Sequence, residues 1–150
     1  MKFTVQTEKE MAALAHKFSE AIILPIIVGV NGYLGAGKTT FIRNLIRVYK
    51  ADEKVKSPTF SIVEEYNYSN IDITHADLYR VKKDEQNYID FRDYYSKNSL
   101  IIIEWIENDI SLMKKSDIII DIEIFKSTDI RRVSFTGNSS KGKQLIQNIR

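Results

Sequence analysis

A short stretch early in the chain has the residue types that bind polyphosphate. Residues 32–39 read GYLGAGKT, which matches the P-loop pattern of two glycines with four residues between them, followed by Lys and then Ser or Thr. Glycine allows the backbone angles that turn successive N–H groups toward phosphate oxygens. Lys38 supplies positive charge for the outer phosphates, and the hydroxyl of Thr39 is an oxygen ligand suited to Mg²⁺. The stretch predicts a nucleotide phosphate site.

The segments on either side of this stretch have the patterns of a strand and a helix. Residues 26–30 read IIVGV, a continuous apolar run typical of a strand that is buried on both faces. Apolar side chains with the spacing of an inner helix face follow the loop, at Phe41, Ile42, Leu45 and Ile46. The start of that helix favours an anion, because its first N–H groups are unpaired. The alternative is a plain glycine turn with a solvated Lys38.

The remaining elements predict an α/β fold, with a mixed β-sheet flanked by helices as in P-loop NTPases. Residues 7–10 (TEKE) fit a capping box that opens a helix. The other expected elements are strands over 60–68 and 71–75, a weak helix over 84–95, a buried strand over 100–103, a hairpin of 118–124 and 131–135 around a turn at 127–129, and a closing helix over 141–150. Buried strands mixed with hairpins favour a mixed sheet over a purely parallel one.

Composition indicates one soluble domain over residues 1–150. Hydrophobic residues make up 43% of the chain and charged residues 28%, as in ordinary globular proteins. Cysteine is absent, which excludes disulfides and thiolate metal sites. The first residues lack a signal-peptide core, and the longest apolar run, 21–30, contains Pro25 and is too short to span a bilayer. We therefore expect a cytoplasmic protein with no membrane partner.

The charge balance does not indicate a nucleic-acid-binding protein, because the net charge is only +2. Basic residues do gather late in the chain, at Lys126, Arg131, Arg132, Lys141, Lys143 and Arg150. Two interpretations remain for this group, a solvated surface or an electrostatic contact with RNA or an acidic partner.

A P-loop needs an acidic group, usually at the end of a buried strand, to hold Mg²⁺ directly or through water. Glu104 follows four apolar residues, and Asp77 follows a predicted strand. Asp121 also follows isoleucines, but its neighbours alternate between apolar and polar, which places it on the solvent face of the hairpin. Spacing leaves both Glu104 and Asp77 as candidates, with a strand-end carboxylate and a turn or cap as their structural alternatives.

Four short motifs occur in an order that resembles one protein family. They are LGAGKTT at 34–40, SPTF at 57–60, HADLYR at 75–80 and IEW at 103–105. With the hairpin beyond them, the set is similar to TsaE, the small bacterial ATPase family of tRNA threonylcarbamoyladenosine (t6A) synthesis, over nearly the whole chain. Tyr33 and Ile106 depart from the family, which usually has an acidic residue or Asn at the first position and Pro at the second. Neither position supplies a required ligand.

The resemblance implies roles for individual residues. Thr39 and Glu104 would hold Mg²⁺, and Asp77, catalytic together with Lys38, would position or deprotonate the attacking water or bind the metal through water. Residues 57–60 would form a switch-like loop near the γ-phosphate. His75 is expected to be structural, because no base-and-orienter pair is evident beside it. The implied nucleotide-binding residues are Thr7 and Glu8 near the adenine, Gly35, Ala36, Gly37, Lys38, Thr39, Thr40, and Trp105, for which a core or interface role is the alternative.

The activity implied by the resemblance is Mg²⁺-dependent ATP hydrolysis that serves a threonylcarbamoyl transferase assembly. The partners would be TsaD and TsaB, which modify adenosine 37 of certain tRNAs, so that tRNA is met indirectly through the assembly. One alternative is a small-molecule kinase of the P-loop class, against which the arginines are scattered along the chain. The other is a non-enzymatic module that binds partners in a nucleotide-dependent way.

Overall fold

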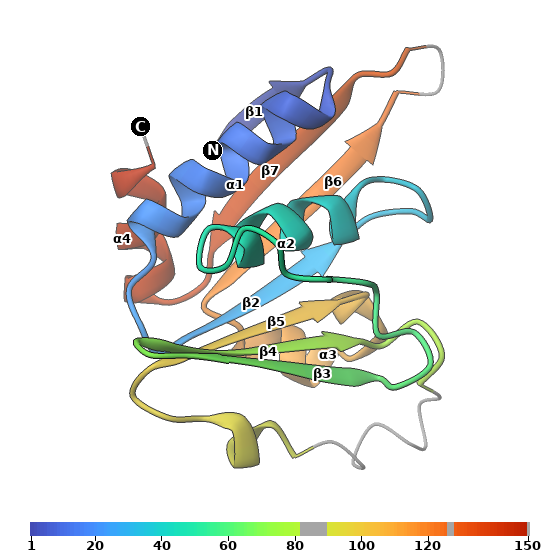
Figure 1. The fold of residues 1–150 in the computed structure, drawn as a ribbon. Helices are drawn as coiled ribbons and strands as arrows, with labels where there is room; N and C mark the ends of the chain where they lie inside the picture. Colours follow the sequence, from blue (N-terminus) through green and yellow to red (C-terminus); the bar gives the residue numbers. More distant parts are fainter. Residues whose placement is uncertain (82–89, 126–127, 150) are drawn as a thin grey trace.

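A computed structural model describes residues 1–81, 90–125 and 128–149. Its centre is a seven-stranded sheet with helices on both faces (Figure 1). In spatial order the strands are β1 (Lys2–Val5), β7 (Arg131–Gly137), β6 (Ile118–Ile124), β2 (Ile26–Asn31), β5 (Ser99–Glu104), β4 (Ile71–Asp77) and β3 (Val63–Tyr68). The four central strands β6, β2, β5 and β4 are parallel, while β7, β1 and β3 are antiparallel to their neighbours. The predicted α/β fold with a mixed sheet is confirmed.

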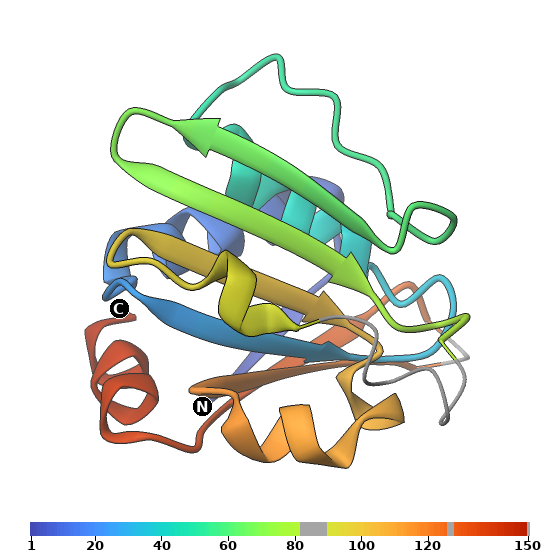
Figure 2. The ribbon, with the colours of Figure 1, turned by 90° about the horizontal axis from the view of Figure 1, so that it is seen from below.

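The helices divide between the two faces of the sheet. Helices α1 (Glu8–Ala21) and α2 (Lys38–Arg47) lie together on one face. The short helices η2 (Phe91–Tyr94), η3 (Ile106–Asn108) and α3 (Ile110–Lys115) lie on the other face (Figure 2). Helix α4 (Ser140–Asn148) contacts β7 and α1. The face with α1 and α2 also carries the P-loop, so its packing determines the geometry of the site.

Aromatic packing fixes α1 and α2 on the sheet. The rings of Phe18 in α1 and Phe41 in α2 lie 5.6 Å apart at their centres, and Phe18 is also 5.6 Å from Phe135 in β7. Both Phe18 and Phe41 are fully buried, and each such side chain contributes about 1.5–3 kcal/mol to folding. The start of α1 is fixed as the capping box predicts, because Thr7 Oγ1 accepts a hydrogen bond from the Glu10 amide at 3.1 Å.

The strand expected over 60–68 is wrong in its first part. Strand β3 begins only at Val63, and Phe60 is 83% exposed. The amide of Ile62 donates to the carbonyl of Pro58, which closes a turn, and Ile62 itself adopts a left-handed φ of 66°. The alternation of apolar residues that predicted a strand therefore spans a loop and a strand, and the loop adjoins the site.

Other boundaries differ less. The strand predicted over 71–75 continues to Asp77, and the hairpin of β6 and β7 forms as expected, although Ser127 of its turn lies outside the described residues. Most of the weak helix at 84–95 also lies outside them, and its described end is the short helix η2. The closing helix is present as α4, and Arg150 lies outside the described residues. Sequence patterns did not predict β1 or α3.

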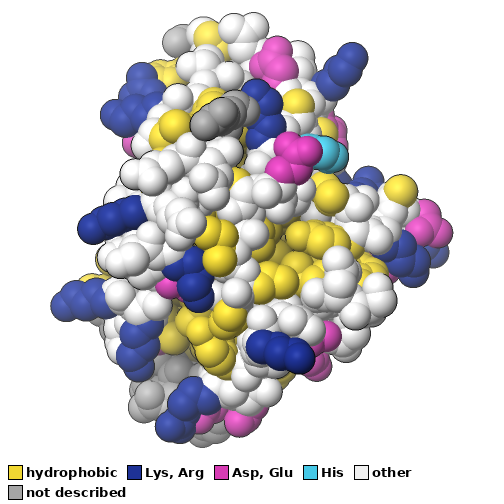
Figure 3. Space-filling view, turned by 90° about the vertical axis from the view of Figure 1, so that its left-hand side faces the viewer, with side chains coloured by type: hydrophobic (Ala, Val, Ile, Leu, Met, Phe, Trp, Pro, Cys, Tyr) yellow, Lys and Arg dark blue, Asp and Glu magenta, His cyan; other side chains and the backbone are white. Residues whose placement is uncertain are grey.

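The end of the molecule opposite the P-loop carries a hydrophobic patch with basic side chains around it (Figure 3). Partly buried hydrophobic residues extend the core at the ends of several elements, among them Ile22, Leu24, Tyr49 and Tyr68. Within the described residues, no helix is long and apolar enough to cross a membrane.

Candidate nucleotide and metal site

The P-loop joins the end of β2 to the start of α2 through left-handed glycines. Gly35 has a φ of 79° and Gly37, the N-cap of α2, a φ of 106°. An L side chain in the left-handed region costs roughly 1–2 kcal/mol, so glycine gives this loop its shape without strain. Among the described residues no side chain caps α2, which leaves its first N–H groups available to an anion.

Lys38 points back over the loop that carries it. It is only 5% exposed, and its Nζ donates to the carbonyls of Gly32 at 2.6 Å and Tyr33 at 3.2 Å. The ammonium also lies 3.9 Å from the centre of the Trp105 ring. Burial lowers the pKa of Lys38, while the nearby negative charges, that of Glu104 first, act to raise it. A phosphate placed here would put negative charge beside the ammonium of Lys38 and so favour its charged form, which burial disfavours.

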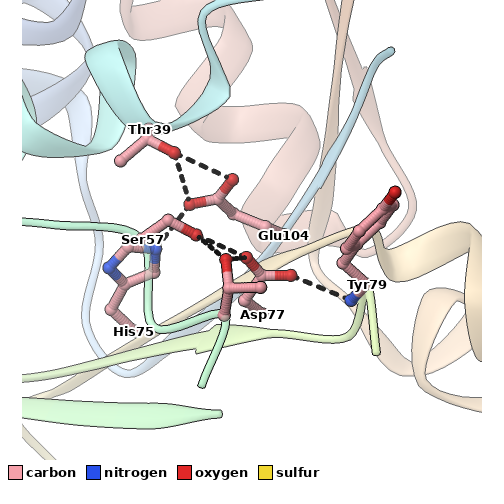
Figure 4. Close-up of polar contacts among 7 residues, drawn as sticks. Thr39, Ser57, His75, Asp77, Tyr79 and Glu104 are labelled. Atoms are coloured by element: carbon pink, nitrogen blue, oxygen red, sulfur yellow. Dashed lines mark hydrogen bonds and ion pairs between the residues drawn. The ribbon is translucent and has the colours of Figure 1, made fainter. Parts of the chain in front are cut away.

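Thr39 and Glu104 form the pair predicted to hold the metal. Glu104 is the last residue of β5 and is 2% exposed. The hydroxyl of Thr39, in the first turn of α2, lies 3.0 and 3.2 Å from the two carboxylate oxygens of Glu104 (Figure 4). A hydroxyl and a carboxylate that converge in this way are hard oxygen donors, the ligand type that Mg²⁺ prefers.

Asp77 lies beside Glu104 because β4 and β5 are parallel neighbours that pair these two residues directly. The Asp77 carboxylate is 2% exposed and accepts three hydrogen bonds. Its Oδ2 accepts from Ser57 Oγ at 2.5 Å and Thr59 Oγ1 at 3.1 Å, and its Oδ1 accepts from the Tyr79 amide at 2.8 Å (Figure 4). Asp77 therefore ties the Ser-Pro-Thr-Phe loop to the sheet edge, a contact that the sequence did not predict.

His75 has a partner that the sequence analysis did not anticipate. Its Nε2 lies 2.8 Å from Glu104 Oε1, and the imidazole is fully buried. The sequence did not predict this contact, because it crosses from β4 to β5 and no sequence spacing reveals it. The third acidic candidate, Asp121, pairs in register with Asn31 of β2 and accepts its amide hydrogen at 2.9 Å. Asp121 is half-buried, and it lies on the opposite face of the sheet from Glu104, because Glu104 pairs with the preceding residue of β2, Val30.

A hollow of about 290 Å³ joins these groups. The indole of Trp105 forms part of its wall and contacts the ring of Tyr79, with centres 4.9 Å apart. Trp105 has a left-handed φ of 57°, which directs the chain into η3. The predicted site residues that line the hollow are Gly35, Gly37, Lys38, Thr39, Thr40, Asp77, Glu104 and Trp105, joined by Ser57 and Thr59.

A second hollow, of about 340 Å³, adjoins the first and shares Gly35, Gly37 and Thr40 with it. Thr7 and Glu8 at the start of α1 line one side, which brings the predicted adenine contacts next to the P-loop. Asp129 and Arg131 of the β6–β7 hairpin line the other side, and Arg131 Nε donates to the Ala36 carbonyl at 3.0 Å. The sequence analysis missed both hairpin residues as site residues, although Arg131 belonged to the late basic group.

The donor set fits Mg²⁺ better than a structural metal. Among the described residues, no group of three or more His, Cys, Asp or Glu side chains is arranged to hold a metal ion. Zinc sites need such a group, whereas Mg²⁺ typically takes one or two protein oxygens and completes its shell with phosphate and water. Thr39 and Glu104 offer that smaller set beside the P-loop.

Comparison with known proteins decides the family. The family model described as "Threonylcarbamoyl adenosine biosynthesis protein TsaE" matches residues 5–133. The chain belongs to the TsaE family. Its relatives include the tRNA threonylcarbamoyladenosine biosynthesis protein TsaE of Haemophilus influenzae, 34% identical, with 95% of this chain and 92% of the relative covered. The TsaE of Aquifex aeolicus is 33% identical over 80% of this chain and 84% of its own length.

A solved structure supports the fold of this TsaE-family chain. The crystal structure of Bacillus subtilis YdiB superposes with a TM-score of 0.81 and covers 99% of this chain and 93% of its own. At 24% sequence identity this likeness concerns the fold. The likeness covers nearly the whole of both chains, which supports the predicted α/β fold with a mixed sheet.

Proposed function

We propose that this TsaE-family chain is a Mg²⁺-dependent ATP hydrolase of the cytoplasmic t6A machinery. One observation carries the proposal. Thr39, the buried Glu104 and the buried carboxylate of Asp77 converge beside Lys38 on one hollow at the carboxyl ends of parallel strands. Open α/β sheets bind their ligands at this edge. The convergence supplies oxygen ligands, a cation and a hydrogen-bond acceptor, which are the groups that phosphoryl transfer to water needs.

Each group has a distinct task. The P-loop amides and Lys38 bind the phosphates, and Thr39 with Glu104 hold Mg²⁺. Mg²⁺, when bound, neutralises charge on the phosphoryl oxygens. Asp77 accepts a hydrogen bond from the attacking water through a lone pair that its three present donors leave free, and so orients the water for in-line attack. Thr7, Glu8, Asp129 and Arg131 surround the space for the adenine beyond the P-loop.

Residues 57–62 form the loop through which hydrolysis is sensed. Ser57 and Thr59 hold Asp77, so a change in what Asp77 contacts also changes what holds the loop. Ile62 stores backbone strain, since a β-branched residue at φ 66° is unfavourable by about 1–3 kcal/mol. Phe60 projects into solvent against Arg80, whose guanidinium lies 4.3 Å from its ring centre. An exposed aromatic on a strained loop is suited to contact the TsaD–TsaB-like assembly, with tRNA reached through that assembly.

The arginines favour hydrolysis over a small-molecule kinase. A kinase clamps the transferring group with several convergent arginines. Here the arginines have separate partners. Arg92 forms an ion pair with Asp90, and Arg132 forms one with Glu123. Arg131 donates a hydrogen bond to the Ala36 carbonyl in the P-loop, and it lines the second hollow and not the one that Asp77 lines. A non-enzymatic module is less well supported, because it would not need a buried carboxylate beside the metal pair.

The test is phosphate release from ATP at increasing Mg²⁺, with and without the TsaD–TsaB-like partners. We expect release to require Mg²⁺, and Glu104→Gln to need far more of it, because an amide does not neutralise the metal. Nucleotide binding by Glu104→Gln in the absence of Mg²⁺ should stay near the wild-type value. Release that is independent of Mg²⁺, or transfer of phosphate to an added small acceptor instead of water, would contradict the proposal.

A further inference from the structure

His75 offers a buried nitrogen to the metal pair from the neighbouring strand. In β4 it pairs in register with Ile102 of β5, and Glu104 stands two residues further on the same face of the sheet. Its Nε2 lies 2.8 Å from Glu104 Oε1, and the two side chains are 0% and 2% exposed (Figure 4). Such a contact, fully removed from water, holds the carboxylate in one orientation.

The other nitrogen of the ring determines which tautomer is present. Within the described part of the chain, Nδ1 of His75 is buried and has no hydrogen-bond partner. A proton on Nδ1 would be a buried donor without an acceptor, which is more costly than an unused lone pair. The proton therefore resides on Nε2 and is donated to Glu104. A donor at Nε2 holds the carboxylate in one orientation beside the position proposed for the cation.

Thr39 and His75 both contact the Glu104 carboxylate, and a bound metal would affect these two hydrogen bonds differently. Thr39 Oγ1 donates to Glu104 in this structure, at 3.0 and 3.2 Å. A Thr39 hydroxyl that directs an oxygen lone pair to Mg²⁺ has to reorient, and this would change its hydrogen bond to Glu104. The hydrogen bond from His75 comes from the opposite side, from β4, and can persist. His75 is then the protein donor that keeps Glu104 aimed at the metal.

We propose that His75 is a positioning residue for metal binding, which holds the Glu104 carboxylate through Nε2–H so that it meets Mg²⁺ without rearranging. The inference rests on the proposed role of Glu104 as a metal ligand. It assigns His75 an effect on the Mg²⁺ requirement and none on the phosphate contacts of Lys38 and the P-loop. Loss of a hydrogen bond of this kind typically lowers metal affinity about 10- to 100-fold.

Calorimetric titration of a non-hydrolysable ATP analogue, at increasing Mg²⁺ and in EDTA, tests the inference. His75→Gln retains a donor at the position of Nε2, while His75→Asn places its amide where Nδ1 lies and falls short of Glu104. We expect His75→Asn and His75→Ala to need about 10- to 100-fold more Mg²⁺ for half-maximal binding. Affinity in EDTA should stay within about threefold of the wild type, and His75→Gln should recover most of the Mg²⁺ response.

Ile73→Ala is the control for general damage, because Ile73 lies in the same strand on the same face, is 1% exposed and belongs to the apolar core. It should lower the melting temperature and leave the Mg²⁺ requirement unchanged. Equal losses with Mg²⁺ and in EDTA, or a wild-type Mg²⁺ response in His75→Asn, would overturn the role of His75. A wild-type protein whose binding ignores Mg²⁺, or an unaffected Glu104→Gln variant, would instead remove the proposed metal site itself.

Discussion

Two loops meet at the site, and they achieve the same left-handed backbone in opposite ways. The P-loop places glycines at its left-handed positions, Gly35 and Gly37, and so reaches its shape without strain. The loop of residues 57–62 places Ile62 in that region and is held by hydrogen bonds from Ser57 and Thr59 to Asp77. The first loop is preorganised to bind phosphate. The second is held in a state that a change at Asp77 can release, which suits a sensor.

The largest change in hydrolysis rate should come from Asp77, which holds the loop of residues 57–62 and lines the same hollow as the P-loop. Asp77→Asn should slow ATP hydrolysis by about 10²- to 10⁴-fold, because the amide is a poorer acceptor for the attacking water. Nucleotide affinity should stay near the wild-type value, since the P-loop contacts are untouched. Phosphate release under single-turnover conditions measures the rate. Asp121→Asn is the matched control, with the same chemical change on the other face of the sheet, and equal rates in the two variants would end the catalytic assignment of Asp77.

A substitution in the P-loop should lower the affinity for ATP and leave the stability of the fold nearly unchanged. Lys38→Ala removes a charge-assisted contact worth about 1.5–3 kcal/mol, so ATP affinity should fall roughly ten- to a hundredfold. The melting temperature should change little, because the buried ammonium is itself costly to fold without phosphate. Calorimetry and a thermal melt check both statements, with the exposed Lys56→Ala as the control. An unchanged affinity for ATP would remove the P-loop from the account.

The fold, and the places of the P-loop and Glu104 in it, could be predicted from the sequence because their signals are local. Residues 26–46 carry strand, glycine loop and helix patterns in one continuous stretch, and Glu104 is marked as the end of a buried strand. The contacts of Asp77 with Ser57 and of His75 with Glu104 join segments whose adjacency only the sheet order reveals. Side-chain spacing along one strand contains no information about its neighbour.

The errors have physical causes as well. Apolar residues at Phe60 and Ile62 extend the alternation of β3, but the turn closed by the Pro58 carbonyl takes them out of the sheet. Strand β1 was missed because it has four residues and pairs only with β7, which lies at the far end of the chain. The hairpin residue Arg131 gave only the signal of a basic group, which fits a solvated surface equally well.

A substitution at a left-handed glycine of the P-loop tests the backbone difference between the two loops. Gly35→Ala should destabilise the protein by about 1–2 kcal/mol, because a β-carbon in the left-handed region is strained there. That carbon would meet no atom within 4 Å, so the cost is conformational and not steric. For a chain of this size the shift corresponds to about 2–4 °C in melting temperature per kcal/mol. A Gly35→Ala variant that melts with the wild type would show that the P-loop does not need its left-handed glycine.

In the loop of residues 57–62, replacing the left-handed Ile62 by a residue that tolerates this backbone should have the smallest effect on stability. Ile62→Asn should raise the stability by about 1 kcal/mol, because Asn tolerates the left-handed region and relieves the strain. Ile62→Val keeps the β-branched side chain and should show no gain, which separates strain from lost packing. Thermal melts of both variants decide the matter. If the Ile62→Asn variant melts at a lower temperature than the Ile62→Val variant, the backbone at Ile62 stores no strain that a substitution can relieve.

Hydrogen exchange distinguishes the roles of the two loops. We propose that one loop binds the nucleotide while the other reports whether the γ-phosphate is present. Backbone amide exchange should be followed without nucleotide, with ADP and Mg²⁺, and with a non-hydrolysable ATP analogue and Mg²⁺. The amides of residues 35–39 should be protected alike by both nucleotides. Those of residues 59–62, above all the Ile62 amide that closes the turn, should exchange differently with the ATP analogue than with ADP. Identical exchange of residues 59–62 in the two nucleotide states would contradict the proposed sensing role of this loop.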